Sequence, residues 1–129
     1  MKNPFDPRHL RRKRAVKELF SWGFQEPQGL KKVKNQLAKS VISRIKKIDR
    51  IISQSAPEWP TAQINRIDLA ILRLAIYEMS IVAKEPPKAI IDEAVELAKE
   101  FGSESSSAFV NGTLGTLLKE ENINEPKNN

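Results

Sequence analysis

The chain has 129 residues, a net charge of +6 and no cysteine, which fits one domain and excludes a fold that depends on disulfide bonds. Residues 1–60 hold 15 Lys and Arg against 5 Asp and Glu, whereas residues 61–129 hold 7 against 11. This uneven distribution favours a polyanionic partner for the first half of the chain.

A helix is predicted from Pro7 to Trp22, after a short flexible arm at residues 1–6. Asp6 supplies an acceptor at the N-cap, and proline suits the first helical position that follows it. Arg12 falls on the line of the apolar face, but one turn before that face begins. The first two turns of the helix are therefore expected to protrude past the core.

The first helix is crowded with basic residues at the end where they are unfavourable. Cations near a helix N-terminus oppose the macrodipole, and these cations also repel one another. So many cations at a helix N-terminus, where anions are preferred, indicate a functional role. Clustered Lys and Arg side chains are typical of binding to a nucleic-acid backbone. A solvated charged face is the alternative that stays open. The basic residues concerned are Arg8, Arg11, Arg12, Lys13, Arg14 and Lys17.

The next stretch predicts a short basic helix from Leu30 to about Gln36 and an amphipathic helix from about Leu37 to Ser55. Two prolines then forbid a continuous helix, and a short helical turn is expected at 61–64. The cations on the outer face of the amphipathic helix are interpreted as solvated surface, because no conflict with the helix dipole singles them out. They are Lys39, Arg44, Lys46, Lys47 and Arg50.

The most apolar stretch runs from Asn65 to Val82 and predicts the central helix of the fold. A helix that is apolar nearly all round belongs in the middle of a domain. This one is too short and carries too many charges to span a bilayer comfortably, so no membrane association is expected. The other helices are expected to wrap around it.

Two amphipathic helices are predicted to follow, from Pro87 to the stop signal at Gly102 and from about Ser106 to Glu120. Gly112 and Gly115 each cost about 1 kcal/mol relative to Ala inside a helix, which indicates close approach of another helix or backbone. The acidic residues of the first of these two helices are interpreted as an outward, solvated face, and the alternative is that Glu93 or Glu96 faces a basic protein partner. They are Asp92, Glu93, Glu96 and Glu100.

Catalytic chemistry is not expected from this sequence. His9 is the single histidine and is placed outside the core, with no cysteine or carboxylate cluster to complete a metal site or a catalytic triad. No strand signal, internal repeat or glycine-rich phosphate loop is found. We therefore expect a non-enzymatic, all-α domain that needs no metal or cofactor.

Four motifs stand in a characteristic order: the arginine-rich stretch Arg12–Trp22, ILRLAIYEM at Ile71–Met79, PPKAIIDEAVELAKEFG at Pro86–Gly102 and FVNGTLG at Phe109–Gly115. In this order and spacing they resemble the NusB family of bacterial transcription antitermination factors, over nearly the whole chain. The resemblance implies an all-α fold of about seven helices in two small bundles around the central apolar helix. Residues 7–121 would form this domain, and residues 122–129 would be a polar tail.

The resemblance also implies a function in the cytoplasm. Members of the family bind boxA-type single-stranded RNA in nascent ribosomal RNA transcripts, together with the small-subunit ribosomal protein NusE and the elongating RNA polymerase. Carried over to this chain, Glu78 and Gly115 become partner contacts. The implied RNA-binding residues are Arg8, Arg11, Arg12, Lys13, Arg14, Lys17, Phe20, Phe109 and Asn111.

Two alternatives stay open beside an antitermination factor. One is a stand-alone RNA-binding module related to the N-terminal domain of ribosomal RNA methyltransferases, although the chain has no room for a nucleotide-binding sheet and no nucleophilic cysteine. The other is a structural module that forms a homodimer through its helices.

Reversal of Arg12 and Arg14 to Glu is expected to abolish RNA binding and to leave the fold intact.

Overall fold

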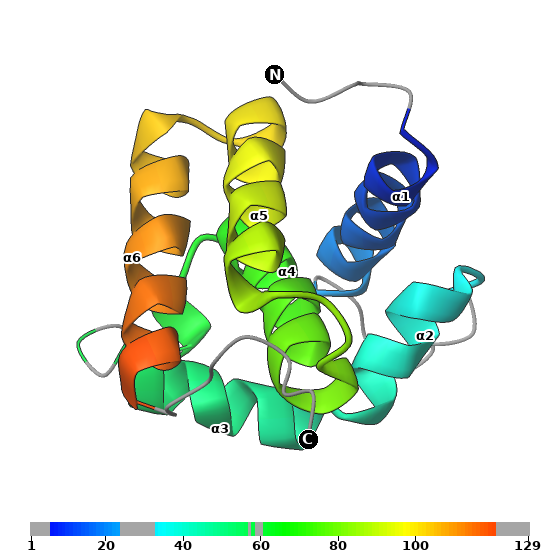
Figure 1. Cartoon of the computed structure of the whole chain (residues 1–129). Helices are drawn as coiled ribbons and strands as arrows, with labels where there is room; N and C mark the ends of the chain where they lie inside the picture. The colour runs from blue at the N-terminus through cyan, green and yellow to red at the C-terminus, as the bar shows by residue number, and fades with distance from the viewer. Residues whose placement is uncertain (1–5, 24–32, 57, 59–60, 121–129) are drawn as a thin grey trace.

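The computed structural model describes residues 6–23, 33–56, 58 and 61–120, whose regular secondary structure is helical throughout (Figure 1). A 3₁₀ turn at Thr61–Gln63 and a π-helical segment at Tyr77–Val82 accompany the α-helices. Within these residues no helix combines the length and the apolar character needed to cross a membrane. The six α-helices are α1 (Pro7–Trp22), α2 (Gln36–Ser43), α3 (Ile45–Ser55), α4 (Arg66–Ile76), α5 (Pro87–Phe101) and α6 (Glu104–Glu120).

Helix α4 is the centre of the fold, as the sequence predicts. Its N-cap residue Asn65 accepts a hydrogen bond from the backbone N–H of Ile67 at 2.9 Å, and every residue from Asp68 to Ile76 is buried. It packs against all five other α-helices. Figure 1 shows α1 on one side of α4 and α5, and α6 on the other.

The predicted fold class is confirmed, whereas the count and layout of its helices need correction. The described residues form six α-helices and not about seven. These helices do not divide into two small bundles, because α4 contacts every one of them. Of the expected short helix at 30–36, residues 33–35 are not helical and α2 begins at Gln36. Residues 30–32 lie outside the described part, as do residues 1–5 of the expected arm and the expected tail.

The predicted helix from Leu37 to Ser55 is in fact two helices, divided at Arg44. The hydroxyl groups of Ser40 and Ser43 donate to the backbone carbonyls of Gln36 and Ser40, at 3.0 and 2.6 Å, and such back-bonding favours a bend. The division serves packing, since α2 contacts α1 while α3 contacts α4 and α6. One straight helix could not reach these separate surfaces.

The C-terminal end of the central helix widens into the π-helical segment, Tyr77–Val82. It ends at Ala83, which has a left-handed backbone with φ of 52° and whose N–H donates to the carbonyl of Glu78 at 2.8 Å. The wider turn leaves Glu78 and Met79 buried. π-Helical turns inside α-helices frequently occur at functional sites.

The glycines of α6 do not mark a close contact within the described structure. A Cβ atom added at Gly112 or Gly115 would meet no heavy atom within 4 Å. The expectation of close helix or backbone approach at these positions is therefore wrong. Helix α6 also begins at Glu104, two residues before the expected start, and the Oγ of Ser103 accepts from the N–H of Ser106 at 3.2 Å.

Candidate nucleic-acid interface

Helix α1 distributes its basic residues over two faces. His9 and Arg12 follow the same helical line as Val16 and Leu19, and they are only 5% and 6% exposed. The first two turns of α1 therefore do not protrude past the core, which corrects that expectation. The outward face carries other cations, which are Arg11, Arg14 and Lys17, all exposed.

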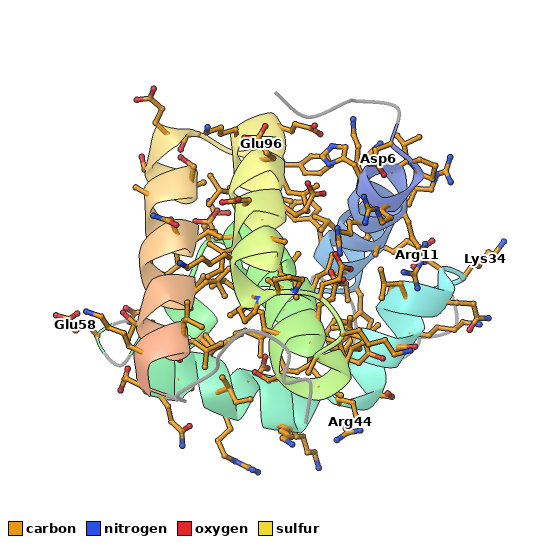
Figure 2. The ribbon with its side chains drawn as sticks, viewed as in Figure 1. Asp6, Arg11, Lys34, Arg44, Glu58 and Glu96 are labelled. Carbon is orange, nitrogen blue, oxygen red and sulfur yellow. The ribbon has the colours of Figure 1, made fainter. Side chains whose placement is uncertain are left out.

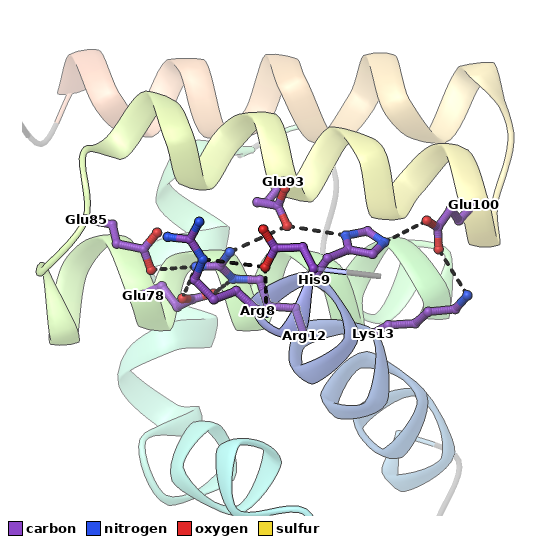
Figure 3. Close-up of polar contacts among 9 residues, drawn as sticks. Arg8, His9, Arg12, Lys13, Glu78, Glu85, Glu93 and Glu100 are labelled. Carbon is purple, nitrogen blue, oxygen red and sulfur yellow. Dashed lines mark hydrogen bonds and ion pairs between the residues drawn. The ribbon is translucent and has the colours of Figure 1, made fainter. Parts of the chain in front are cut away.

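Arg12 is the centre of a buried ion-pair cluster (Figure 3). Its Nε and Nη2 atoms donate to the two carboxylate oxygens of Glu78, both at 2.8 Å. Nη2 also donates to Glu85 at 2.7 Å, and Nη1 lies 3.5 Å from a carboxylate oxygen of Glu93. Burial lowers the pKa of Arg12, but these three carboxylates outweigh it and raise the pKa above its ordinary value. The guanidinium group is therefore held charged.

His9 lies between two carboxylates of α5 (Figure 3). Its Nδ1 is 3.3 Å from Glu93 and its Nε2 is 2.7 Å from Glu100. An ionised carboxylate only accepts hydrogen bonds, so both ring nitrogens can donate only when the imidazole is protonated. Burial lowers the pKa of His9, but the bonds to Glu100 and Glu93 outweigh it and raise the pKa. Lys13 completes the cluster with its Nζ 3.4 Å from Glu100.

The structure corrects the sequence-based placement of Glu93 at this cluster. Glu93 was expected on a solvated face, yet it is 8% exposed and turned toward α1, because Arg12 and His9 compensate its burial. Glu78, for which the resemblance implies a partner contact, is 9% exposed, and both of its carboxylate oxygens accept from Arg12. The sequence did contain a signal for this burial. His9 and Arg12 are three residues apart, and this spacing places both side chains on the helical face that carries Val16 and Leu19.

An open pocket of about 170 Å³ borders the cluster, between the start of α1 and α5. The positive and negative side chains that line the pocket largely neutralise one another. We therefore interpret the pocket as the edge of the ion-pair cluster and not as a binding site for an anion. Among the described residues, no group of three or more His, Cys, Asp or Glu is arranged to hold a metal ion. The lining residues are Asp6, Arg8, His9, Arg12, Glu85, Ala89 and Glu93.

The outward cations of α1 differ from the inward ones in lacking acidic partners. Within the described segments, Arg11, Arg14 and Lys17 form no ion pair, while the side chain of Arg8, 71% exposed, has only Asp6 at 3.6 Å. Asp6 acts mainly as the N-cap of α1, accepting from the N–H of Arg8 at 2.8 Å. The helix thus presents a row of free positive charges to solvent.

The remaining candidate residues do not join this row. Phe20 and Phe109 are half-buried and pack against the core. Asn111 is exposed on α6, and Gly115 is half-buried on the same helix. Because α6 lies beyond α5 from α1 in Figure 1, the structure divides the predicted RNA-binding residues between two sides of the molecule.

Comparison with known proteins identifies relatives of this chain. The NusB family model matches residues 9–119. The transcription antitermination protein NusB of Chloroflexus aggregans is 58% identical over 73 residues, which are 55% of this chain and 49% of that protein. The corresponding protein of Desulfatibacillum aliphaticivorans is 35% identical over 100 residues, 78% of this chain and 70% of that protein. The chain thus spans only about half the length of the Chloroflexus relative.

Solved structures agree with the sequence comparisons. NusB of T. maritima has a TM-score of 0.76 and 30% identity, covering 93% of this chain and 94% of that one. A complex described as antitermination factors NusB and NusE with dsRNA has a TM-score of 0.71 and 22% identity, covering 89% of this chain and 99% of that one, which shows the fold alone. With its family match over most of its length and this shared fold, the chain belongs to the NusB family.

Proposed function

We propose that this protein is an RNA-binding transcription antitermination factor that holds boxA-type RNA on α1 and acts together with NusE and the elongating RNA polymerase in the cytoplasm. The observation that carries the proposal is the outward row of Arg11, Arg14 and Lys17, which is exposed and lacks acidic partners in the described residues. Free Lys and Arg side chains release counterions from a nucleic acid, and this release drives binding.

The relatives support the same assignment. Those in Chloroflexus aggregans and Desulfatibacillum aliphaticivorans are named transcription antitermination proteins. The NusB–NusE–dsRNA complex pairs a similar fold with NusE and with an RNA. The RNA there is double-stranded, whereas the boxA-type element that we propose is single-stranded, so both forms belong in the binding tests.

The proposed roles of the basic residues follow their exposure. Arg11, Arg14 and Lys17 contact phosphates, and Arg8 adds a contact at the helix start. Arg12, whose guanidinium is buried among carboxylates, acts as a positioning residue that fixes the orientation of α1. Lys13 is half-exposed beside Glu100 and contributes in the same way.

The proposed NusE surface lies on α6. Asn111 and Gly115 are four residues apart on this helix and share its outward side. The open space at Gly115 would allow a partner backbone to approach closely. Glu78 is left out of this surface because Arg12 already engages both of its carboxylate oxygens.

Charge reversal on the outward row tests the proposal. Arg11→Glu with Arg14→Glu is expected to weaken binding of a boxA-type RNA at least about tenfold at low salt. It should also reduce the slope of log affinity against log salt by about 1.4, because each lost phosphate contact removes about 0.7. Fluorescence anisotropy titrations over a range of salt, with and without NusE, measure both quantities.

The matched control is Lys84→Glu with Lys88→Glu, which changes the net charge equally on two exposed residues just before and at the start of α5. It should retain nearly all of the affinity. Equal losses in the two variants, or an affinity of the unchanged protein that does not depend on salt, would contradict RNA binding through α1. Size-exclusion chromatography of the same samples tests the homodimer alternative.

A further inference from the structure

We propose that a second cationic surface, formed by Arg44, Lys46, Lys47 and Arg50 at the start of α3, binds the backbone of the same RNA strand beyond the part held by α1. This inference rests on the proposed function and extends it to a surface on another helix. We call these four residues the α3 cationic surface.

The division of the predicted long helix at Arg44 gives these residues their significance. In one continuous helix they would lie along its middle, where the macrodipole has little effect. In the structure Arg44 is the N-cap of α3 and makes no side-chain capping bond, and the first turn contains no acidic residue. Lys46 and Lys47 therefore stand where cations are unfavourable, each by a few tenths of a kcal/mol.

The α3 cationic surface is also not neutralised within the described residues. All four side chains are exposed, and none forms an ion pair there. Asp49 is the one acid of α3, and both of its oxygens accept from Arg73 at 3.0 Å. On α1, by contrast, the inward cations are paired with carboxylates of α5, of the π-helical segment and of the turn between them. The repulsion between Lys46 and Arg50, one turn apart, is thus left uncompensated.

Helix α2 links the α3 cationic surface to the side of the molecule that carries α1. Glu18 of α1 accepts from the backbone N–H groups of Lys34 and Asn35, at 2.7 and 3.1 Å, which fixes the start of α2 against α1. Lys34 and Lys39 are both exposed along this route. In Figure 2, Arg11 and Lys34 lie on the side that carries α1 and α2, and Arg44 lies below them, where α2 passes into α3.

The spacing suits a nucleic-acid strand. Helix α2 has eight residues and therefore extends over about 12 Å. A stacked strand rises about 3.4 Å per nucleotide along its axis, so about four nucleotides would cover that distance. An RNA strand bound along α1 could thus reach α3 if it were extended by a few nucleotides. Its negatively charged phosphates are complementary to the exposed Lys and Arg side chains on α2 and α3.

The experiment compares RNA lengths and uses the full chain. The variant is Lys46→Glu/Lys47→Glu/Arg50→Glu, and the control with equal charge change is Lys84→Glu/Lys88→Glu/Lys119→Glu, all exposed. The probes are the core of a boxA-type RNA, about 6 nucleotides, which is too short to occupy α1 and also span α2, and the same RNA with an unstructured extension to about 30. Relative to the control, the α3 variant should bind the short RNA within about twofold and the long RNA about tenfold more weakly.

Each other outcome decides against the proposal. Equal affinity of the two triple variants for the long RNA would show that α3 does not touch the strand. Equal loss on both RNAs, or a lowered melting temperature of the α3 variant, would indicate a structural or primary-site role instead. The Arg11→Glu/Arg14→Glu variant keeps the two proposals apart: full binding of the short RNA by that variant would refute the α1 site, independently of the long-RNA result.

Discussion

Arg12 and Arg14 are two positions apart in α1 and carry the same side chain, yet their surroundings are opposite. Arg12 is 6% exposed and bonded to Glu78 and Glu85, while Arg14 is exposed and has no acidic partner among the described residues. A buried charge that loses its partner is strongly destabilising, whereas an exposed charge can be removed at little cost. The Arg12→Glu/Arg14→Glu variant is consequently not expected to keep the fold intact.

Single alanine substitutions separate these two roles. Arg12→Ala is expected to lower the free energy of unfolding by about 3–5 kcal/mol, because it leaves buried carboxylates without their cation. Arg14→Ala should change it by no more than about 0.5 kcal/mol. Urea denaturation followed by circular dichroism measures both. A mild effect of Arg12→Ala would mean that water reaches the cluster and that Arg12 does not fix α1.

The π-helical segment at Tyr77–Val82 shows how a single element links the core to the interface. It continues the buried central helix and brings Glu78 to Arg12 of α1. Its end requires a left-handed residue, and Ala83 occupies that position with φ of 52°. An L-residue in this conformation costs about 1–2 kcal/mol, a penalty from which glycine is free.

Replacing that alanine tests whether the strain is real. Ala83→Gly is expected to raise the free energy of unfolding by about 0.5–1 kcal/mol, since the relief of strain exceeds the added flexibility of the unfolded chain. Thermal melting of the variant beside the unchanged protein measures the gain. A lower melting temperature would show that Ala83 is not strained in solution.

Local sequence signals predicted the elements that depend on their own residues. Asp6 and the proline after it set the start of α1, and Asn65 with its apolar successors set α4. The division at Arg44 was not predictable in this way, because it reflects packing of α2 and α3 on different helices. The ion-pair cluster was missed for a similar reason, since His9 and Glu93 are distant in sequence and come together only through the fold.

At the scale of the whole molecule, two buried groups couple stability to pH. Burial raises the pKa of Asp68, although the Ser106 side chain acts in the opposite direction, and the carboxylates around His9 raise its pKa despite burial. Both groups bind a proton more tightly in the folded state. Their stabilising contribution is therefore complete below the unfolded pKa and is lost as the pH rises through the folded value.

His9 is expected to determine how the free energy of unfolding changes with pH near neutrality. The free energy of unfolding should fall as the pH rises above 6.5, the ordinary pKa of the imidazole, because the folded protein then loses the proton shared with Glu93 and Glu100. Melting temperatures measured from about pH 6 to 9 should show the decline. His9→Gln should remove most of the decline, and an unchanged profile in this variant would exclude His9 as its cause.

The two faces of α1 also bear on how homologues are compared. Each residue turns an α-helix by about 100°, so one residue inserted between Arg14 and Ala15 would turn Arg12 away from its carboxylates and toward solvent. The number of Lys and Arg residues at the start of α1 therefore does not predict which homologues bind polyanions more tightly. Only the charges in phase with Arg11 and Arg14 belong in such a ranking.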